Sequence, residues 1–131
     1  MKKYEELDIT DPFIFAKVMS EKELCKPLLE NILNIKIRDI VYVDYEETIQ
    51  MTAKSKGIRL DRYVEDDNNT VFNLEMQTTT YKELPKRSRY YQGIIDLNMI
   101  EKGESYDILK ESYVIFICTF DFFEKGRSVY E

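Results

Sequence analysis

The architecture of this chain follows from one segment, residues 60–77, which have the sequence LDRYVEDDNNTVFNLEMQ. The polar run Asp66–Asn69 in its middle is a strong turn signal, because Asn and Asp tolerate positive φ angles. After the turn, apolar residues alternate with polar ones, which is the period of a β-strand. The segment therefore predicts a β-hairpin with strands over Ile58–Val64 and Thr70–Thr78.

The length of the connecting loop determines which residues of the hairpin face each other. A three-residue loop over Asp67–Asn69 suits an Asn in the left-handed conformation, and it places Asp61 directly opposite Glu75. Gln77, two residues further on, projects from the same face. Two carboxylates and an amide then converge at one end of the hairpin. A two-residue loop would instead place Leu74 opposite Asp61, and the carboxylates would not meet.

Opposed carboxylates destabilise a sheet unless something neutralises them. A divalent cation does so, since Mg²⁺ is bound by one or two carboxylates together with water and phosphate oxygens. Such an ion polarises a phosphoryl group and activates water. The plainer interpretation is that Glu75 and Gln77 form the solvent face of an edge hairpin, with Asp61 at the end of a strand.

Helical and strand patterns flank this hairpin on both sides. Residues 12–34 have helical spacing, with Asp11 as N-cap and an interruption near residue 20 or 27. Ile40–Gln50 is rich in β-branched and aromatic residues, and Glu83–Lys102 has a helical period. Ser112–Phe120 is a nearly continuous apolar run, which is typical of a parallel strand buried on both faces. This order predicts an α/β fold with a mixed sheet.

Composition restricts the chemistry that the chain can perform. Its 131 residues suffice for one domain, and they contain no His, which excludes imidazole bases, Ser-His-Asp triads and His-ligated zinc. The two cysteines are far apart in the sequence and cannot form a thiolate zinc site. Carboxylates, amides, hydroxyls, Lys and Arg remain, and this set suits hard cations. Without a membrane-spanning run or a signal peptide, we expect a cytoplasmic protein with no membrane partner.

A local basic segment stands out, because the net charge of the chain is −6. Residues 81–91, YKELPKRSRYY, contain four Lys or Arg residues and one Glu at the start of the second predicted helix. Basic side chains and a helix N-terminus favour phosphates, and aromatic rings stack on bases. Arg87 and Tyr91 lie on one face of this helix. The alternative is a solvated first turn, with Tyr91 covering the core.

Four segments resemble the PD-(D/E)XK nuclease superfamily, and more closely its recombination-promoting nuclease and transposase branch. They are DPFIFAKVM, LDRYVEDDNNTVFNLEMQ, LPKRSRYYQGIID and YVIFICTFDFF. The predicted order α-β-β-β-α-β matches the core of that superfamily over nearly the whole chain. The resemblance implies a restriction-endonuclease-like core. It also implies one nuclease-like domain over residues 1–131 that lacks the C-terminal region of the family.

The resemblance also implies roles for the hairpin residues. Asp61 and Glu75 would ligate Mg²⁺ or Mn²⁺, and the backbone carbonyl of Met76 would be a further ligand. Gln77 occupies the place usually held by the lysine of the motif. Because Gln carries no charge and cannot titrate, either the metal alone activates water or a nearby cation such as Arg87 compensates.

The expected activity is metal-dependent hydrolysis of DNA phosphodiesters in recombination or transposition. The expected contacts to DNA are Lys86, Arg87, Arg89 and Tyr91. A homodimer is a further possibility for the assembly of the protein. We expect no organic cofactor. The alternative is an inactive remnant that binds nucleic acid or another copy of itself without turnover. The missing lysine, the acidic charge and the short C-terminus favour that alternative.

Overall fold

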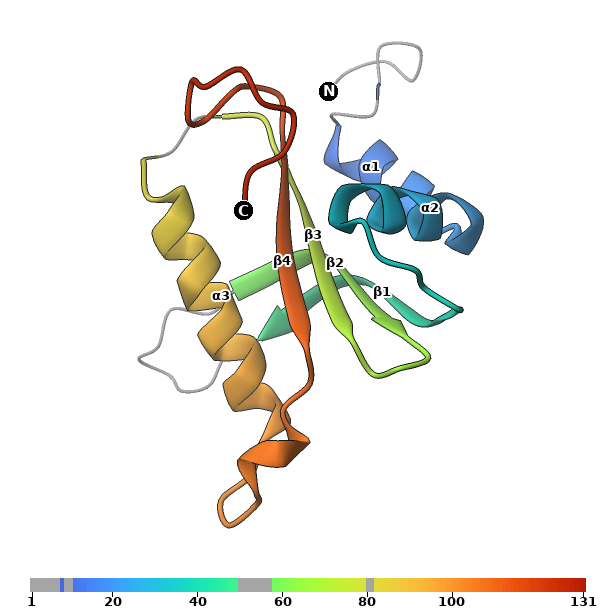
Figure 1. Cartoon of the computed structure of the whole chain (residues 1–131), viewed down its shortest axis with the longest axis vertical. Coiled ribbons are helices and arrows are strands. Elements are labelled where there is room, and N and C mark those ends of the chain that lie inside the picture. The colour runs from blue at the N-terminus through green and yellow to red at the C-terminus, as the bar shows by residue number, and fades with distance from the viewer. Residues whose placement is uncertain (1–7, 9–10, 50–57, 80–81) are drawn as a thin grey trace.

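A computed structural model describes residues 8, 11–49, 58–79 and 82–131 of the chain (Figure 1). The order of elements confirms the predicted α/β fold, although Gln50, the end of the first predicted strand, lies outside the described residues. In chain order the elements are α1 (Pro12–Met19), α2 (Lys22–Leu33), β1 (Ile40–Ile49), β2 (Ile58–Asp66), β3 (Val71–Gln77), α3 (Leu84–Met99), the 3₁₀ helix η2 (Tyr106–Ile108) and β4 (Ser112–Cys118).

The four strands form one mixed sheet in the order β1-β2-β3-β4. Neighbouring strands are antiparallel from β1 to β3, whereas β3 and β4 are parallel. Helices α1 and α2 lie on one side of the sheet and α3 on the other (Figure 1). Strand β3 is therefore paired along both edges and covered on both faces.

The face of the sheet toward α1 and α2 holds the larger hydrophobic core. Phe72 and Leu74 of β3 pack there against Phe15 of α1 and Leu29 of α2, and all four side chains are buried. Tyr113 of β4 adds a stacked ring, 5.5 Å from that of Phe72 between centroids. Each large apolar side chain buried in this way contributes about 1.5–3 kcal/mol. Packing in this core directs Phe72 and Leu74 toward α1 and α2, so the odd-numbered residues of β3 point to the opposite face.

The opposite face of β3 carries polar side chains under α3. Val71 packs against Tyr91, Ile94 and Ile95 of that helix. The next three residues on this face are Asn73, Glu75 and Gln77, which are exposed by only 0%, 4% and 8%. The interpretation of this face as a solvated edge is therefore wrong, because β3 is central and α3 covers it.

The hairpin between β2 and β3 confirms the three-residue loop. Cα partners run from Arg62 with Leu74 to Glu65 with Val71. The backbone N–H of Asp66 donates to the carbonyl of Thr70 at 3.1 Å, which closes the loop. The last loop residue, Asn69, has a φ of 61°, in the left-handed region that the predicted loop requires.

The first helical segment is interrupted at one of the two predicted places. Asp11 starts α1 as predicted, because its Oδ1 accepts from the backbone N–H of Ile14 at 3.4 Å. The break falls at Ser20, whose hydroxyl donates to the carbonyl of Lys17 at 2.5 Å and closes α1. Pro27 does not interrupt the helix, since α2 runs from Lys22 to Leu33 with Pro27, an exposed residue, inside it.

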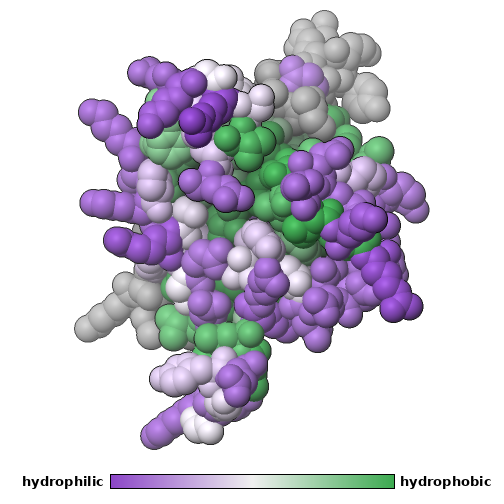
Figure 2. All heavy atoms as spheres, in the orientation of Figure 1, coloured by the Kyte–Doolittle hydropathy of each residue, from purple (hydrophilic) through white to green (hydrophobic). Residues whose placement is uncertain are grey.

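Strand β4 is parallel to β3, as the apolar run predicted, but it is not buried on both faces. It lies at the edge of the sheet, and only Ile115 among its residues is buried. The C-terminal segment turns back beside this edge (Figure 1). Hydrophobic side chains gather between that segment and α1–α2 on the surface in Figure 2. An edge strand leaves its flank open, which explains the partial burial.

The left-handed conformation of Asn69 yields a stability prediction. We expect Asn69→Val to lower the free energy of unfolding by about 1–2 kcal/mol, because a β-branched residue is strained at positive φ. Asn69→Gly is the matched control and should change the free energy of unfolding by less than about 0.5 kcal/mol. Urea unfolding of the three proteins measures the difference. Equal stabilities would mean that this conformation does not determine the loop.

Candidate functional site

The polar row on β3 lies where the sheet opens between β2 and β3. In the part of the chain that the structure describes, β3 pairs with β2 as far as Leu74, which lies opposite Arg62. Its pairing with β4 continues as far as Gln77, which lies opposite Cys118. In Figure 1 the two antiparallel strands spread apart from their shared hairpin. Glu75 and Gln77 thus stand at the end of a central strand, with α3 above them.

The amide of Gln77 is held at both ends. Its Nε2 donates to the carbonyl of Thr79 at 2.6 Å, and its Oε1 accepts from Nη1 of Arg87 at 3.4 Å. The oxygen of the amide therefore points toward the first turns of α3. This contact joins the end of β3 to the basic segment that the sequence singled out.

Arg87 is half-buried and is held by aromatic groups as well as by Gln77. Its Nη2 donates to the hydroxyl of Tyr91 at 3.0 Å, one turn further along α3. The guanidinium carbon lies 5.7 Å from the ring centroid of Tyr91 and 5.8 Å from that of Phe116. Cation–π contacts at this range are attractive and restrict the side chain. The charge of Arg87 is therefore fixed beside the end of β3.

The surroundings of Arg87 keep it charged. Partial burial lowers the pKa of its guanidinium, but the hydrogen bond to Tyr91 and the charges of Glu75 and Glu83 together raise the pKa above its usual value. Glu75 is the buried member of this pair of carboxylates. A positive charge therefore stands near the buried carboxylate of β3, as opposite charges favour each other.

The basic segment divides into an inner and an outer part. Arg87 and Tyr91 face the sheet, whereas Lys86 and Arg89 are exposed. Hydrophilic side chains project from the α3 side of the molecule in Figure 2. The interpretation of the whole segment as a solvated first turn thus holds for Lys86 and Arg89 but not for Arg87.

Two predicted metal ligands are only partly placed. Asp61 lies in β2, directly before Arg62, which pairs with Leu74 of β3. If the same register continued by one residue, Asp61 would lie opposite Glu75. The side chain of Asp61 lies outside the described residues. Met76 follows Glu75, and its side chain packs on the α1–α2 core. The predicted roles of both residues stay predictions.

A family model named PD-(D/E)XK nuclease family transposase matches residues 11–131. The chain belongs to this family. No curated protein and no solved structure matches it. Members of the PD-(D/E)XK group generally use divalent metals. None of the helices in the described ranges has the length and apolar character needed to cross a membrane.

The donor set on the α3 face fits the divalent cation that PD-(D/E)XK nucleases use. Within the described ranges, no three His, Cys, Asp or Glu side chains cluster as metal ligands. The face does present the carboxylate of Glu75 and the amides of Asn73 and Gln77. Carboxylate and carbonyl oxygens are the ligands that Mg²⁺ and Mn²⁺ prefer. The polar atoms of Asn73 lack hydrogen-bond partners among the described residues, so the site retains unused polar groups.

Asn73 is a buried member of this polar row that the sequence did not single out. The alternation of Asn73, Glu75 and Gln77 with apolar residues was visible in the sequence. Alternation alone assigns Asn73 no role, because a polar residue near a hairpin is usually solvated. The alternating row of Asn73, Glu75 and Gln77 is the signal that could have identified it. If the strand is assumed to be central, all three side chains of the row are expected to be buried.

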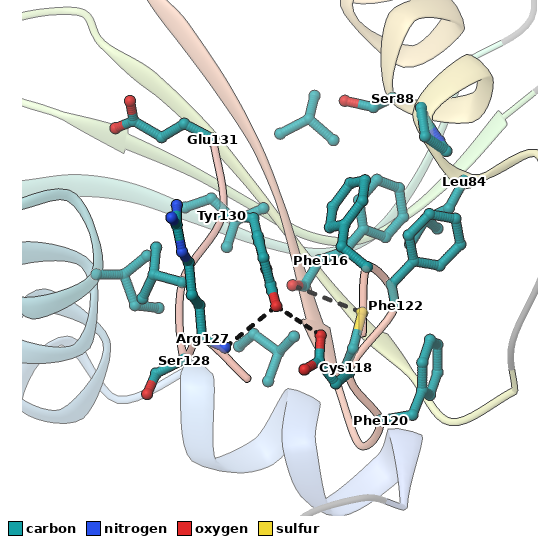
Figure 3. Close-up of a pocket in the computed structure, with 18 of the residues that line it drawn as sticks. Leu84, Ser88, Phe116, Cys118, Phe120, Phe122, Arg127, Ser128, Tyr130 and Glu131 are labelled. Atoms are coloured by element: carbon teal, nitrogen blue, oxygen red, sulfur yellow. Dashed lines mark hydrogen bonds between the residues drawn. The ribbon is translucent and has the colours of Figure 1, made fainter. Parts of the chain in front are cut away.

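A pocket of about 900 Å³ lies next to this cluster, along the open edge of β4 (Figure 3). Its walls include Leu84 and Ser88 of α3 and the aromatic ring of Phe116, which also contacts Arg87. Tyr130 and Asp121 of the C-terminal segment also line the pocket, and the hydroxyl of Tyr130 donates to Asp121 at 2.7 Å. Its lining is mainly apolar, so the pocket borders the polar site rather than forming it.

The partly buried hydrogen bonds of Arg87 yield a stability prediction. We expect Arg87→Met to lower the free energy of unfolding by about 1–2 kcal/mol, because it removes hydrogen bonds to Gln77 and Tyr91 and the positive charge near Glu75. Lys86→Met, its exposed neighbour, should change the free energy of unfolding by less than about 0.5 kcal/mol. Chemical denaturation distinguishes the two, and equal small effects would contradict the structural role of Arg87.

Proposed function

We propose that this PD-(D/E)XK protein is a DNA endonuclease that hydrolyses phosphodiester bonds with Mg²⁺ or Mn²⁺ in recombination or transposition. The observation that carries the proposal is the buried carboxylate of Glu75 beside the Gln77–Arg87–Tyr91 cluster. A carboxylate is costly to bury unless cations and hydrogen bonds compensate it. A buried carboxylate at the end of a central strand is typical of a catalytic site.

Glu75 and Asp61 would hold the cation, with the backbone carbonyl of Met76 as a further ligand. When bound, the cation supplies polarisation of the scissile phosphate and a lowered pKa for the attacking water. Gln77 cannot act as a base, because its amide does not titrate. Since Arg87 and Thr79 hold both ends of that amide, its role is to orient groups in the site.

Arg87 takes over the positive charge that the lysine of the motif would provide. Its guanidinium lies 3.4 Å from the Oε1 of Gln77, which stands in the lysine position. Arginine stays charged at any physiological pH, so Arg87 stabilises negative charge without exchanging protons. Tyr91 contributes by holding Arg87, through a hydrogen bond and through its ring.

Lys86 and Arg89 would bind the DNA backbone. Both are exposed on the first turns of α3, close in sequence to Arg87. Phosphate contacts of this kind position the duplex and carry no sequence information. A local patch of this sort is required, because the chain as a whole has a net charge of −6 and does not attract DNA by bulk electrostatics.

Removal of either carboxylate tests the proposed reaction. We expect Asp61→Asn and Glu75→Gln to slow plasmid cleavage in Mg²⁺ by about a thousandfold or more, because a cation contributes several kcal/mol to the transition state. Both variants should stay folded, since each replaces a carboxylate by an amide of nearly the same shape. Glu83→Gln, an exposed carboxylate near Arg87, is the control and should cleave at the rate of the unmodified protein.

Two outcomes would contradict this proposal. Full cleavage by Glu75→Gln would place the reaction elsewhere. An unmodified protein that binds DNA but does not cleave it in Mg²⁺ or in Mn²⁺ would support the alternative, an inactive member of the family that retains only binding.

Salt dependence tests the proposed DNA contacts. We expect Lys86→Ala and Arg89→Ala each to weaken DNA binding uniformly across sequences, and to reduce the slope of log K against log salt by about 0.9 per lost phosphate contact. Lys102→Ala, beyond the other end of α3, is the control and should leave the slope unchanged. Fluorescence anisotropy at several salt concentrations measures the slopes. Unchanged slopes in both variants would move the DNA interface away from α3.

A further inference from the structure

Asn73 carries a buried amide whose hydrogen-bonding capacity is unused. Its side chain is fully buried on the central strand, and neither Oδ1 nor Nδ2 has a hydrogen-bond partner among the described residues. Leaving a buried amide unpaired costs the desolvation free energy of the group with no compensating hydrogen bond. Native proteins usually satisfy such groups with ordered water or a bound ligand. A polar residue at this position therefore requires an explanation that packing does not supply.

The position of Asn73 relates it to Glu75. The two residues are separated by one residue on β3, so their side chains leave the same face of the strand about 7 Å apart. The two side chains make no direct hydrogen bond, because neither polar atom of Asn73 has a partner among the described residues, and one water molecule between them would hydrogen-bond to both. The partner of Asn73 on β4 is the apolar Val114, and its partner on β2 is Tyr63, whose hydroxyl donates to Glu65 at 2.8 Å.

We propose that Asn73 is a positioning residue of the metal site, whose amide holds a water molecule that donates a hydrogen bond to the carboxylate of Glu75. The inference rests on the proposed function, because it takes Glu75 to be a metal ligand. Carboxylates that bind metals are themselves held by hydrogen bonds, and loss of such a partner weakens metal binding by about 10- to 100-fold.

The two amides that flank Glu75 differ in a way that supports this assignment. Gln77 has both ends of its amide engaged, by Thr79 and by Arg87. Asn73 has neither end engaged by a described residue. As a neutral group with a donor and an acceptor, Asn73 can order a water without changing the charge that a cation must neutralise.

Calorimetric titration of the full chain with Mg²⁺ or Mn²⁺ alone tests this assignment. We expect Asn73→Leu to raise the Kd for the metal about tenfold or more. Thermal stability in EDTA should be unchanged or higher, because an unpaired amide has been replaced by an apolar side chain of similar shape. A purely structural role of Asn73 would alter stability and leave the Kd unchanged.

A second pair of variants keeps the test decisive if Asn73→Leu does not fold. Asn73→Ser and Asn73→Ala leave similar cavities, but only Ser retains a hydroxyl that can hold water. We expect Asn73→Ser to bind metal more tightly than Asn73→Ala by about tenfold. Equal affinities for the two, or an Asn73→Leu variant within twofold of the unmodified protein, would overturn the role of Asn73.

Glu75→Ala in the same titration separates this inference from the proposed function. Loss of metal binding in Glu75→Ala, with full binding in the Asn73 variants, would overturn only the role of Asn73. Unchanged metal binding in Glu75→Ala would overturn the metal site itself, and the role of Asn73 with it.

Discussion

The central position of β3 is the constraint on which the rest of this molecule depends. Hydrogen bonds to β2 and β4 hold its two edges, and packing on α1–α2 and α3 covers its two faces. The apolar side of the strand, with Phe72 and Leu74, secures it in the larger core. Its other side then has to lie under α3, and this buries the polar groups of Glu75 and Gln77. Burial gives these groups an environment of low dielectric, in which charges act strongly.

Helix α3 supplies the positive charge that this buried face requires. Arg87 reaches Gln77 from the first turns of the helix, and its hydrogen bond to Tyr91 and its ring contacts hold it there. Phe116 connects this cluster to the edge strand β4 and to the pocket beside it. The site is therefore assembled from β3, α3 and β4 together, and none of these elements would position it alone.

The sequence predicted the hairpin well, because its signals are local. Asn69 tolerates a positive φ, and this set the loop length and thereby the register from Arg62 with Leu74 onward. The burial of β4 was not predictable in this way. An apolar run indicates a parallel strand, but whether that strand lies inside a sheet or at its edge depends on the neighbours that it finds, and β4 finds only β3.

The order of elements, the hairpin and the residue types of the site were determined by the sequence by itself, since periodicity and turn chemistry act over a few residues. The tertiary structure alone decided that Glu75 and Gln77 are buried and that Arg87 turns inward while Lys86 and Arg89 stay exposed. It also decided that Asn73 is buried without a hydrogen-bond partner among the described residues. The physical reason is that burial is a property of the assembled layers. A strand with alternating residues has the same local pattern whether water or a helix covers its polar side.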